Sequence, residues 1–415
     1  MTSSISNYTR PLAFIGLMFF AIGFGIGTNG LLVPVIKQSL GVTDALSYLL
    51  YAATFVPFLL FPYPASRLIA RIGYKYTMAV ANGIFTLAFA TFALSASIAN
   101  TNVLWGLALC FIATFVAGAA NATLQAAVNP YVTILGPIEK AASRISIMGI
   151  CNKLSWPLPA LFIMAILWLN DVHLPIAQLR LADLVLPFGV LALLFASIGL
   201  LACYVTLPEV TATGETTEKA DSISHSHARL TDFPHLWLGC IALFLYVGAE
   251  VMSLATLTDY ATTLGLANAT LYNWIGPVGI TLGYILGIIL IPRYLSQVTA
   301  LRLCAITALV GTLLTLALPA MLSIYALGIV ALGCSLMWPA IWPLAMADLG
   351  SYTKTGASVL TMANIGGALL PLLFGLLKST LGMQYAYALC LVCFGFIAHY
   401  AFYGYKCRKS RPISV

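Results

Sequence analysis

Glu250 is the residue whose type and position most strongly indicate chemistry. It ends the stretch Tyr246-Val-Gly-Ala-Glu250, inside an apolar segment that starts near Leu236. At about 1.5 Å per helical residue, its carboxyl lies roughly 21 Å along the helix, within a hydrocarbon core about 30 Å thick. An ionisable group at that depth costs about 2.5 kcal/mol or more and marks a functional site by default. We predict a cation ligand or proton carrier. The alternative is a structural glutamate that pairs with a lysine or is protonated.

Two other charged residues lie in or near the same membrane depth. Lys153 is about 16 Å into a predicted helix, so it either neutralises Glu250, stands where a cation would bind, or extends toward the membrane surface. Asp259 follows Glu250 by nine residues, which places it on the opposite face of an ideal helix and about 35 Å along it. The spacing predicts an interfacial position for Asp259, with ion coupling as the alternative.

A pair of amides occupies the polar end of another apolar segment. Gln125 and Asn129 are four residues apart, so they share one helix face. Amides at membrane depth are costly unless a partner, a cavity or a ligand satisfies them. Pro130 also interrupts the helix, because proline lacks a backbone N–H. This pattern predicts an inward face that lines a solute pathway. The alternative for each amide is a hydrogen bond between helices.

The composition predicts an all-α membrane protein that positions these groups. The chain has 415 residues, of which 61% are hydrophobic and 7% charged, and its mean hydropathy is +0.98. Soluble domains carry about 25% charged residues. With roughly 20 apolar residues per helix, the chain can form about twelve transmembrane helices. The nine cysteines are scattered through apolar runs and show no metal-ligand spacing. An enzyme would need a nucleophile, base or metal constellation. The sequence shows none, so we predict neither an enzyme nor a metal site.

The apolar segments divide into six, a polar loop and six more. We predict an N-terminal half at 1–207, a linker at 208–233 and a C-terminal half at 234–415. Among the 19 Lys and Arg residues, only Lys37, Arg180 and Lys378 fall near the side opposite the termini, with Lys153 inside a helix. This asymmetry predicts that both termini and the linker are cytoplasmic. The net charge of +7 therefore reflects topology and not nucleic-acid binding. The predicted segments are 11–36, 45–69, 77–98, 103–135, 142–170, 183–207, 234–263, 270–292, 298–318, 321–347, 355–377 and 383–405.

Several stretches resemble the major facilitator superfamily. The predicted loop at 66–75 is similar to the superfamily's loop motif at Arg71, Gly73 and Lys75, but it has Ala70 where an acidic residue is usual. Within the superfamily, residues 124–137 resemble the helix-four motif of the L-fucose/proton symporter family. The matching stretches in later helices are residues 246–250, 335–350 and 366–367. This resemblance implies the major facilitator fold, with twelve transmembrane helices in two six-helix halves.

The chain departs from that family at two acidic positions. Gln125 stands where the fucose symporter carries a buried glutamate, and Gly30 follows Asn29 where it carries an aspartate. A glutamine cannot take up and release a proton near neutral pH, so proton coupling does not transfer simply. The 246–250 stretch resembles glucose/galactose members that are described as sodium-coupled. The resemblance therefore favours sodium over protons as the coupling ion.

The resemblance also implies a sugar as the solute. Amides supply donors and acceptors for hydroxyls without charge. Trp338 or Trp342 could cover the C–H face of a sugar ring, since an indole offers a flat apolar surface. The amides that we expect to bind hydroxyls are Asn29, Gln125, Asn129, Asn152 and Asn364, with Asn273 as a further amide of the same type.

The sequence therefore predicts a hexose transporter of the bacterial inner membrane that works by alternating access and is coupled to a cation. We expect Na⁺ or H⁺ as the only cofactor, sugar and lipid bilayer as partners, and neither nucleic acid nor an obligate protein partner. One alternative is a sugar uniporter with a Lys153–Glu250 pair. Another is a drug/proton antiporter, whose large apolar or cationic substrates suit an amide-rich cavity less well.

Overall fold

A computed structural model of the protein describes residues 9–40, 43–135, 141–207, 230–291, 294–349 and 352–407. Within these ranges, eleven helices are long and apolar enough to cross a membrane, and a shorter apolar helical stretch spans Leu49–Leu60. The expectation of about twelve membrane segments therefore agrees with the structure. Most of the predicted linker, residues 208–229, lies outside the described residues. We use "N-terminal half" for residues 9–207 and "C-terminal half" for residues 230–407.

The second predicted segment, 45–69, is not a single helix. It forms three short helices and the start of a fourth, because Pro57 and Pro62 each lack a backbone N–H and begin a new helix. The predicted loop at 66–75 is also mostly helical. Its break is confined to Gly73, whose φ of 78° and ψ of 172° are readily available only to glycine. The helices of this half are α1 (Thr9–Leu40), α2 (Asp44–Ser47), α3 (Leu49–Phe55), α4 (Pro57–Leu60), α5 (Pro62–Ala99), α6 (Val103–Ile134), α7 (Ala141–Ser155), α8 (Leu158–Leu169), η2 (Ile176–Gln178), η3 (Leu181–Leu184) and α9 (Val185–Tyr204).

The C-terminal half contains each predicted apolar segment, most of them as two helices separated by a short break. Breaks at membrane depth free backbone groups, which are tolerated only where protein or a cavity surrounds them. The helices are η5 (Leu230–Asp232), α10 (Pro234–Ala255), α11 (Leu257–Thr263), α12 (Ala269–Tyr272), α13 (Ile275–Leu290), α14 (Gln297–Ala317), α15 (Ala320–Cys334), α16 (Met337–Met346), α17 (Thr353–Met362), η7 (Ala363–Ile365), α18 (Gly366–Leu381), α19 (Met383–Ala386), α20 (Ala388–Phe402) and η8 (Gly404–Lys406).

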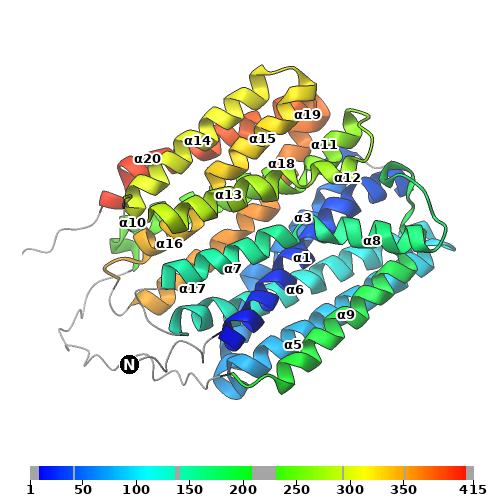
Figure 1. Ribbon diagram of the computed structural model, residues 1–415, viewed down its shortest axis with the longest axis horizontal. Helices are drawn as coiled ribbons and strands as arrows, with labels where there is room; N and C mark the ends of the chain where they lie inside the picture. The colour runs from blue at the N-terminus through cyan, green and yellow to red at the C-terminus, as the bar shows by residue number, and fades with distance from the viewer. Residues whose placement is uncertain are drawn as a thin grey trace, which may run out of the picture.

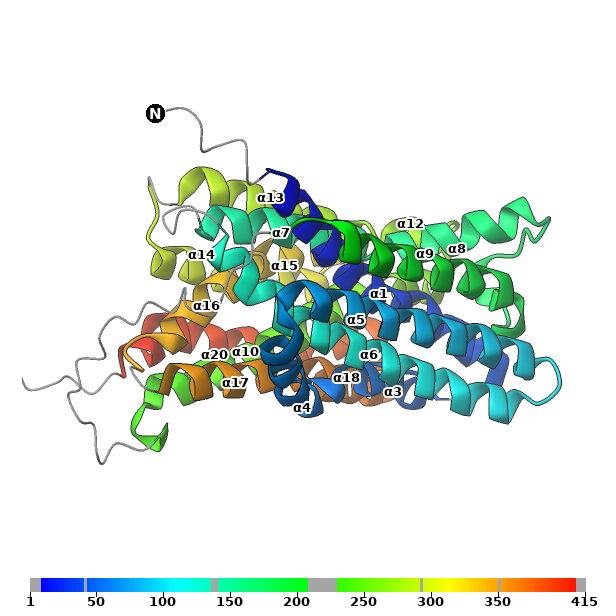
Figure 2. The ribbon, with the colours of Figure 1, turned by 90° about the horizontal axis from the view of Figure 1, so that it is seen from below.

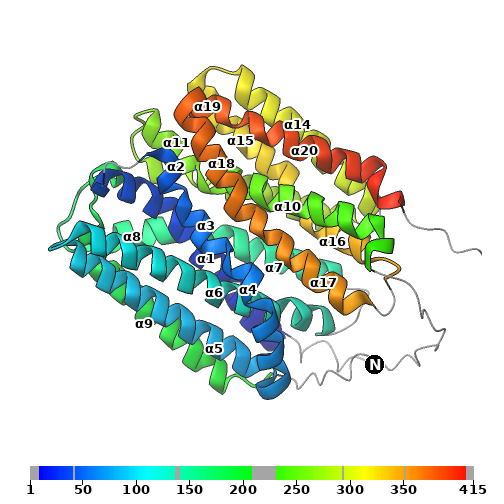
Figure 3. The same ribbon diagram turned by 180° about the vertical axis from the view of Figure 1, so that it is seen from behind.

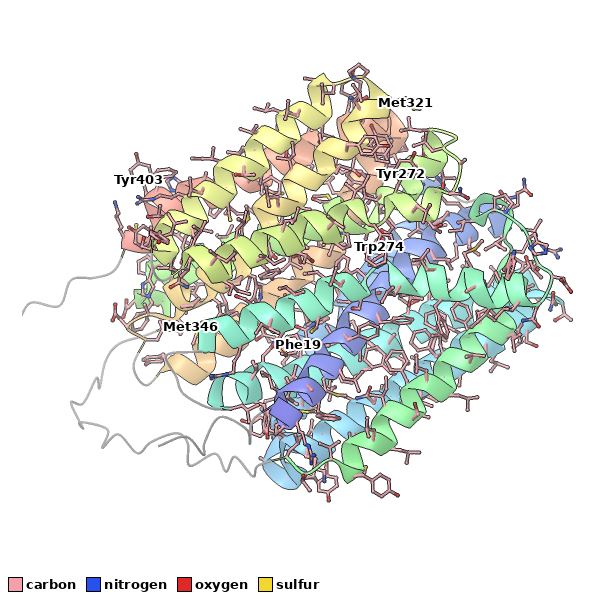
Figure 4. All side chains as sticks on the ribbon, in the orientation of Figure 1. Phe19, Tyr272, Trp274, Met321, Met346 and Tyr403 are labelled. Carbon is pink, nitrogen blue, oxygen red and sulfur yellow. The ribbon has the colours of Figure 1, made fainter. Side chains whose placement is uncertain are left out.

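The two halves lie side by side, with the N-terminal half below the C-terminal half in Figure 1. The first and last helices, α1 and α20, have their chain-end termini on the same side of the bundle, which we call the terminal side. Met346 and Tyr403 mark this side of the C-terminal half, whereas Tyr272 and Met321 mark the opposite or far side (Figure 4).

Two pairs of helices join the halves. α7 lies beside α13 (Figures 1 and 2), and α3 lies beside α18 (Figure 3). A Cβ atom at Gly149 of α7 would lie 2.7 Å from the ring of Tyr284 on α13. A Cβ atom at Gly367 of α18 would lie 2.8 Å from the ring of Phe55 on α3. Glycine at these two positions therefore lets the halves approach closely.

α1 packs directly on α7 within the N-terminal half. A Cβ atom at Gly23 would lie 1.9 Å from the carbonyl oxygen of Asn152, and one at Gly27 would lie 2.0 Å from that of Trp156. Glycines four residues apart let membrane helices approach with their backbones nearly in contact. This packing fixes the end of α7, which carries Asn152 and Lys153, and the turn after it, which carries Trp156.

Candidate functional site

One cavity lies between the halves and takes its walls from both. α1, α3, α4, α6 and α7 line it from the N-terminal half, and α10, α13, α16 and η7 line it from the C-terminal half. Phe19 marks the α1 wall, where that helix passes α7 (Figure 4). The polar lining consists of Gln125, Asn129, Asn152, Lys153, Tyr246, Glu250, Tyr284 and Asn364. The remaining lining consists of Phe19, Ile22, Ile26, Phe55, Phe58, Ile145, Gly149, Trp156, Val247, Val251 and Trp338.

An ion pair crosses the cavity from one half to the other. The Nζ atom of Lys153 on α7 lies 2.8 Å from Oε2 of Glu250 on α10, and the two side chains are 10% and 8% exposed. The hydroxyl of Tyr246 donates a hydrogen bond of 2.5 Å to Oε1 of Glu250. Both carboxylate oxygens therefore have protein donors. We call Lys153, Tyr246 and Glu250 the central cluster.

Trp156 completes the surroundings of the lysine, and the sequence analysis missed it. The Lys153 ammonium lies 4.5 Å from the centroid of the Trp156 ring, and the tryptophan is only 4% exposed. A desolvated contact of this type contributes about 2 kcal/mol. The two residues are three apart on a helix, so their spacing predicts a shared face. That spacing next to Pro157, which caps the start of α8, is the signal that could have identified Trp156.

Four of the predicted amides line the cavity. Gln125 donates to Oδ1 of Asn121 at 2.9 Å, and Asn152 donates to the carbonyl oxygen of Phe19 at 3.1 Å. Asn364 donates to the carbonyl oxygen of Thr361 at 2.9 Å, and Asn129 is the fourth amide of the lining. A primary amide has two N–H donors and a carbonyl acceptor, so one internal bond leaves further capacity for a solute.

The two predicted tryptophans take different positions. Trp338 lines the cavity, and Trp342 does not. The ring of Trp342 lies 5.3 Å from that of Trp338, centroid to centroid, with a tilt of 31° between their planes. Trp342 therefore supports Trp338 by packing against it, one helical turn away.

Asn29 does not line the cavity, which differs from the predicted hydroxyl-binding position. It is buried, and its amide donates to the hydroxyl of Thr54 at 2.7 Å. Asn29 belongs to α1 and Thr54 to α3, so this bond joins two helices of the N-terminal half. Asn29 therefore makes a hydrogen bond between helices, which is the alternative role that the sequence analysis gave for each amide.

Asp259 is buried inside the protein near the far side of the bundle, and its expected interfacial depth stays a prediction. It is 3% exposed, and its Oδ2 accepts bonds of 2.7 Å from both the Tyr48 hydroxyl and the Lys378 ammonium. Lys37 lies 3.7 Å from Oδ1. The prediction assumed one straight helix, whereas the chain breaks at Thr256, between α10 and α11.

These residues join the halves at the far side. Lys37 and Tyr48 come from the N-terminal half, whereas Asp259 and Lys378 come from the C-terminal half. Tyr51 adds a hydrogen bond of 3.2 Å from its hydroxyl to the carbonyl oxygen of Ala255. We call Lys37, Tyr48, Asp259 and Lys378 the far-side cluster. None of the four is part of the cavity lining.

Comparison with known proteins places this architecture in a family. The family model of the Major Facilitator Superfamily matches residues 14–371. The chain belongs to the major facilitator superfamily. It is therefore a multi-pass membrane transporter and not an enzyme. Among solved structures, the fold is similar to that of FucP, a transporter of this superfamily in the outward conformation, with a TM-score of 0.70 and 23% identity. That match covers 96% of this chain and 99% of the other.

Two relatives in sequence cover nearly the whole chain. A glucose/galactose transporter of Brucella abortus biovar 1 (strain 9-941) is 30% identical over 413 residues, which cover 98% of this chain and 96% of the relative. An L-fucose-proton symporter of Escherichia coli (strain K12) is 25% identical over 403 residues, which cover 91% and 88%. The fucose relative is named for a proton, and neither name mentions sodium. The expected preference for sodium therefore finds no support in these relatives.

Proposed function

We propose that this protein carries a neutral hexose-type sugar across a bacterial inner membrane by alternating access. The observation that carries the proposal is a single cavity walled by both halves and lined by amides, an indole and a neutralised ion pair. Transporters of this construction move by rocking one half against the other around a central site. The relatives named for glucose, galactose and fucose support a sugar as the substrate.

The lining suits a sugar in two ways. Gln125 and Asn129 of α6 and Asn152 of α7 offer uncharged donors and acceptors from the N-terminal half, and Asn364 offers them from the C-terminal half. Trp338 offers an apolar ring for the C–H face of the sugar. Because a sugar would contact both halves at once, its binding free energy can differ between the two states, and only such a difference biases the rocking.

Lys153 takes the place of a coupling cation in this proposal. Its ammonium lies 2.8 Å from Glu250, and Tyr246 occupies the other carboxylate oxygen. A sodium ion would have to displace the ammonium, and a proton would have to neutralise a carboxylate that is already compensated. The protein would therefore equilibrate sugar as a uniporter. Uniport is the alternative that the sequence analysis left open, and the contact between the lysine and the glutamate supports it.

Proton symport is the second candidate, favoured by the L-fucose relative that is named a proton symporter. In that mechanism Glu250 takes up a proton from water, its carboxylate becomes a neutral acid, and Lys153 keeps its own proton and loses its partner. The Tyr246 hydroxyl lies 2.5 Å from Glu250 and would hold the neutral acid in place.

Uptake of radiolabelled glucose, galactose and fucose into proteoliposomes tests both mechanisms, with sodium and proton gradients imposed separately. Uniport predicts equilibration without accumulation under either gradient, whereas proton symport predicts accumulation driven by the proton gradient alone. Gln125→Ala should weaken sugar uptake, and Asn170→Ala is the matched control, because Asn170 is an exposed amide bonded to the Ile166 carbonyl. Absence of flux for all three sugars would overturn the substrate assignment, and competition by lipophilic cations would favour drug transport.

A further inference from the structure

A groove on the outer surface of the N-terminal half shares no lining residue with the central cavity and has no role in the proposed transport cycle. It runs between α5 and α9, which form the lower edge of the bundle in Figure 1. Its walls include Tyr76, Ala79 and Gly83 from α5 and Ala196 and Gly199 from α9, and Arg71 lies at one end. The groove opens to the surface that faces the bilayer.

Small side chains keep this groove hollow, and aromatic packing keeps it rigid. A Cβ atom at Gly83 would have no neighbour within 4 Å, so there is open space above this glycine. On the buried side, α5 and α9 are held together by stacked rings. Phe89 lies 5.0 Å from Phe195, and Phe92 lies 5.0 Å from Phe188, centroid to centroid. The groove is therefore a preformed feature of two firmly packed helices.

The length of the groove matches one leaflet of a bilayer. Arg71 and Ile72 line the groove before the break at Gly73, and beyond the break its α5 wall runs from Tyr76 to Thr86, which is about 15 Å at 1.5 Å per helical residue. The hydrocarbon core of a bilayer is about 30 Å thick, so one leaflet contributes about 15 Å. The end that carries Arg71 lies on the terminal side, where α5 turns at Gly73. Arg71 thus stands at the depth of the lipid headgroups.

The charge at this end suits an anion. Arg71 is exposed and, within the described part of the chain, makes no hydrogen bond or ion pair. No Asp or Glu occurs between residues 45 and 138. Arg67 is different, since its guanidinium donates to the Tyr63 hydroxyl at 2.5 Å. A free guanidinium binds phosphate through two parallel hydrogen bonds.

We propose that this groove binds an anionic phospholipid, with one acyl chain between α5 and α9 and the phosphate on Arg71. The chain length, the preformed shape and the unpaired arginine all fit this occupant. A second copy of the protein fits less well. A twofold interface uses the same surface patch on both copies, so it would bring two Arg71 side chains together.

Native mass spectrometry of the purified full chain in detergent tests the proposal. The probes are phosphatidylglycerol and phosphatidylcholine with identical acyl chains. We expect preferential retention of phosphatidylglycerol and a roughly tenfold loss of that preference in Arg71→Gln, which corresponds to about 1.4 kcal/mol. Arg71→Lys should retain part of the preference. Arg67→Gln is the matched control and should behave as the unaltered chain.

A second variant tests the acyl chain separately. Gly83→Leu fills the groove and should lower retention of both lipids, while thermal unfolding confirms that each variant is folded. Equal retention of the two lipids by the unaltered chain would overturn the proposal, as would an unchanged preference in Arg71→Gln. A dimer that Gly83→Leu abolishes would assign the groove to a second copy instead. None of these outcomes depends on sugar transport.

Discussion

The central and far-side clusters are built from the same groups but are arranged differently across the boundary between the halves. Glu250 on α10 and Asp259 on α11 are buried carboxylates, and each contacts a lysine and a tyrosine. For Glu250 the tyrosine belongs to its own half and the lysine, Lys153, to the other. For Asp259 the closest lysine, Lys378, belongs to its own half, and the tyrosine to the other.

This difference indicates which contacts can separate during transport. When the halves part at the far side, Asp259 loses Tyr48 and Lys37 but keeps Lys378 at 2.7 Å, so no buried charge is left uncompensated. Separation at the centre would leave both Glu250 and Lys153 without an opposite charge, which costs about 3–5 kcal/mol in buried pairs. We therefore expect the far-side contacts to break in every cycle and the central pair to persist as the point about which the halves rock.

Glu250→Gln should have the largest effect. It leaves the Lys153 ammonium buried without a carboxylate, and the expected loss of about 3–5 kcal/mol lowers the unfolding temperature and reduces sugar uptake at least about tenfold. Scanning fluorimetry and proteoliposome uptake measure the two effects. The double variant Lys153→Met/Glu250→Gln should regain most of the thermal stability. Normal uptake by Glu250→Gln alone would contradict the assigned pair.

The two lysines of the far-side cluster should differ strongly from each other. Lys378→Met removes the own-half partner of Asp259 and should lower the unfolding temperature nearly as much as Glu250→Gln does. Lys37→Met removes a side chain that is 30% exposed and 3.7 Å away, and partly exposed pairs contribute at most about 1 kcal/mol. Thermal unfolding of the two matched variants measures this difference in stability. Equal destabilisation would remove the distinction between own-half and cross-half partners.

Tyr48→Phe should loosen the far side and lower stability less than Lys378→Met does, because Asp259 keeps Lys378. It deletes one bond between the halves, and a hydrogen bond to a charged group contributes about 1.5–3 kcal/mol. We expect a severalfold faster reaction of an Ala255→Cys variant with a water-soluble thiol reagent. The exposed cysteines, Cys203 and Cys407, are replaced by serine in both backgrounds. An unchanged labelling rate would mean that Tyr48 does not hold the far side closed.

Trp156→Leu should have the smallest effect and should act only through Lys153. Loss of the ring contact costs about 2 kcal/mol or less, and Trp156→Phe should recover part of it. The readout is the unfolding temperature in the presence and absence of Lys153. Trp156→Leu should destabilise the unaltered chain more than it destabilises Lys153→Met. Equal effects in both backgrounds would show that Trp156 only fills space.

The fold was largely predictable because a bilayer permits few structures. Backbone groups in hydrocarbon must bond within a helix, so apolar length alone locates the segments. Because the helical rise per residue is constant, the start of each segment also predicted the depths of Glu250 and Lys153. Apolar length did not locate the helix break before Asp259, because the break at Thr256 occurs in Leu-Ala-Thr-Leu-Thr, which contains no proline or glycine. A break of this kind depends on contacts with the other half, which spacing cannot show.

The candidate site was predictable only in part. Gln125 and Asn129 could be placed on an inward face by their spacing, and both line the cavity. Asn29 has the same chemistry, yet it bonds to Thr54, because which amides meet a neighbouring helix depends on how helices pack. Because Lys153 and Glu250 lie at similar depths, the sequence allowed Lys153 to be proposed as the partner of Glu250. It could not decide between this pairing and a Lys153 side chain that extends toward the membrane surface. The distance of 2.8 Å to Lys153 is a property of the assembled halves.

Uptake by Lys153→Ala tests the central claim most directly, because it removes the ammonium and leaves Glu250 in place. The account predicts that the unaltered chain equilibrates sugar under either gradient. Folded Lys153→Ala should transport only when protons or sodium ions are supplied to compensate Glu250. Accumulation of sugar by the unaltered chain, or ion-independent equilibration by Lys153→Ala at the normal rate, would contradict the role of Lys153 as a built-in cation.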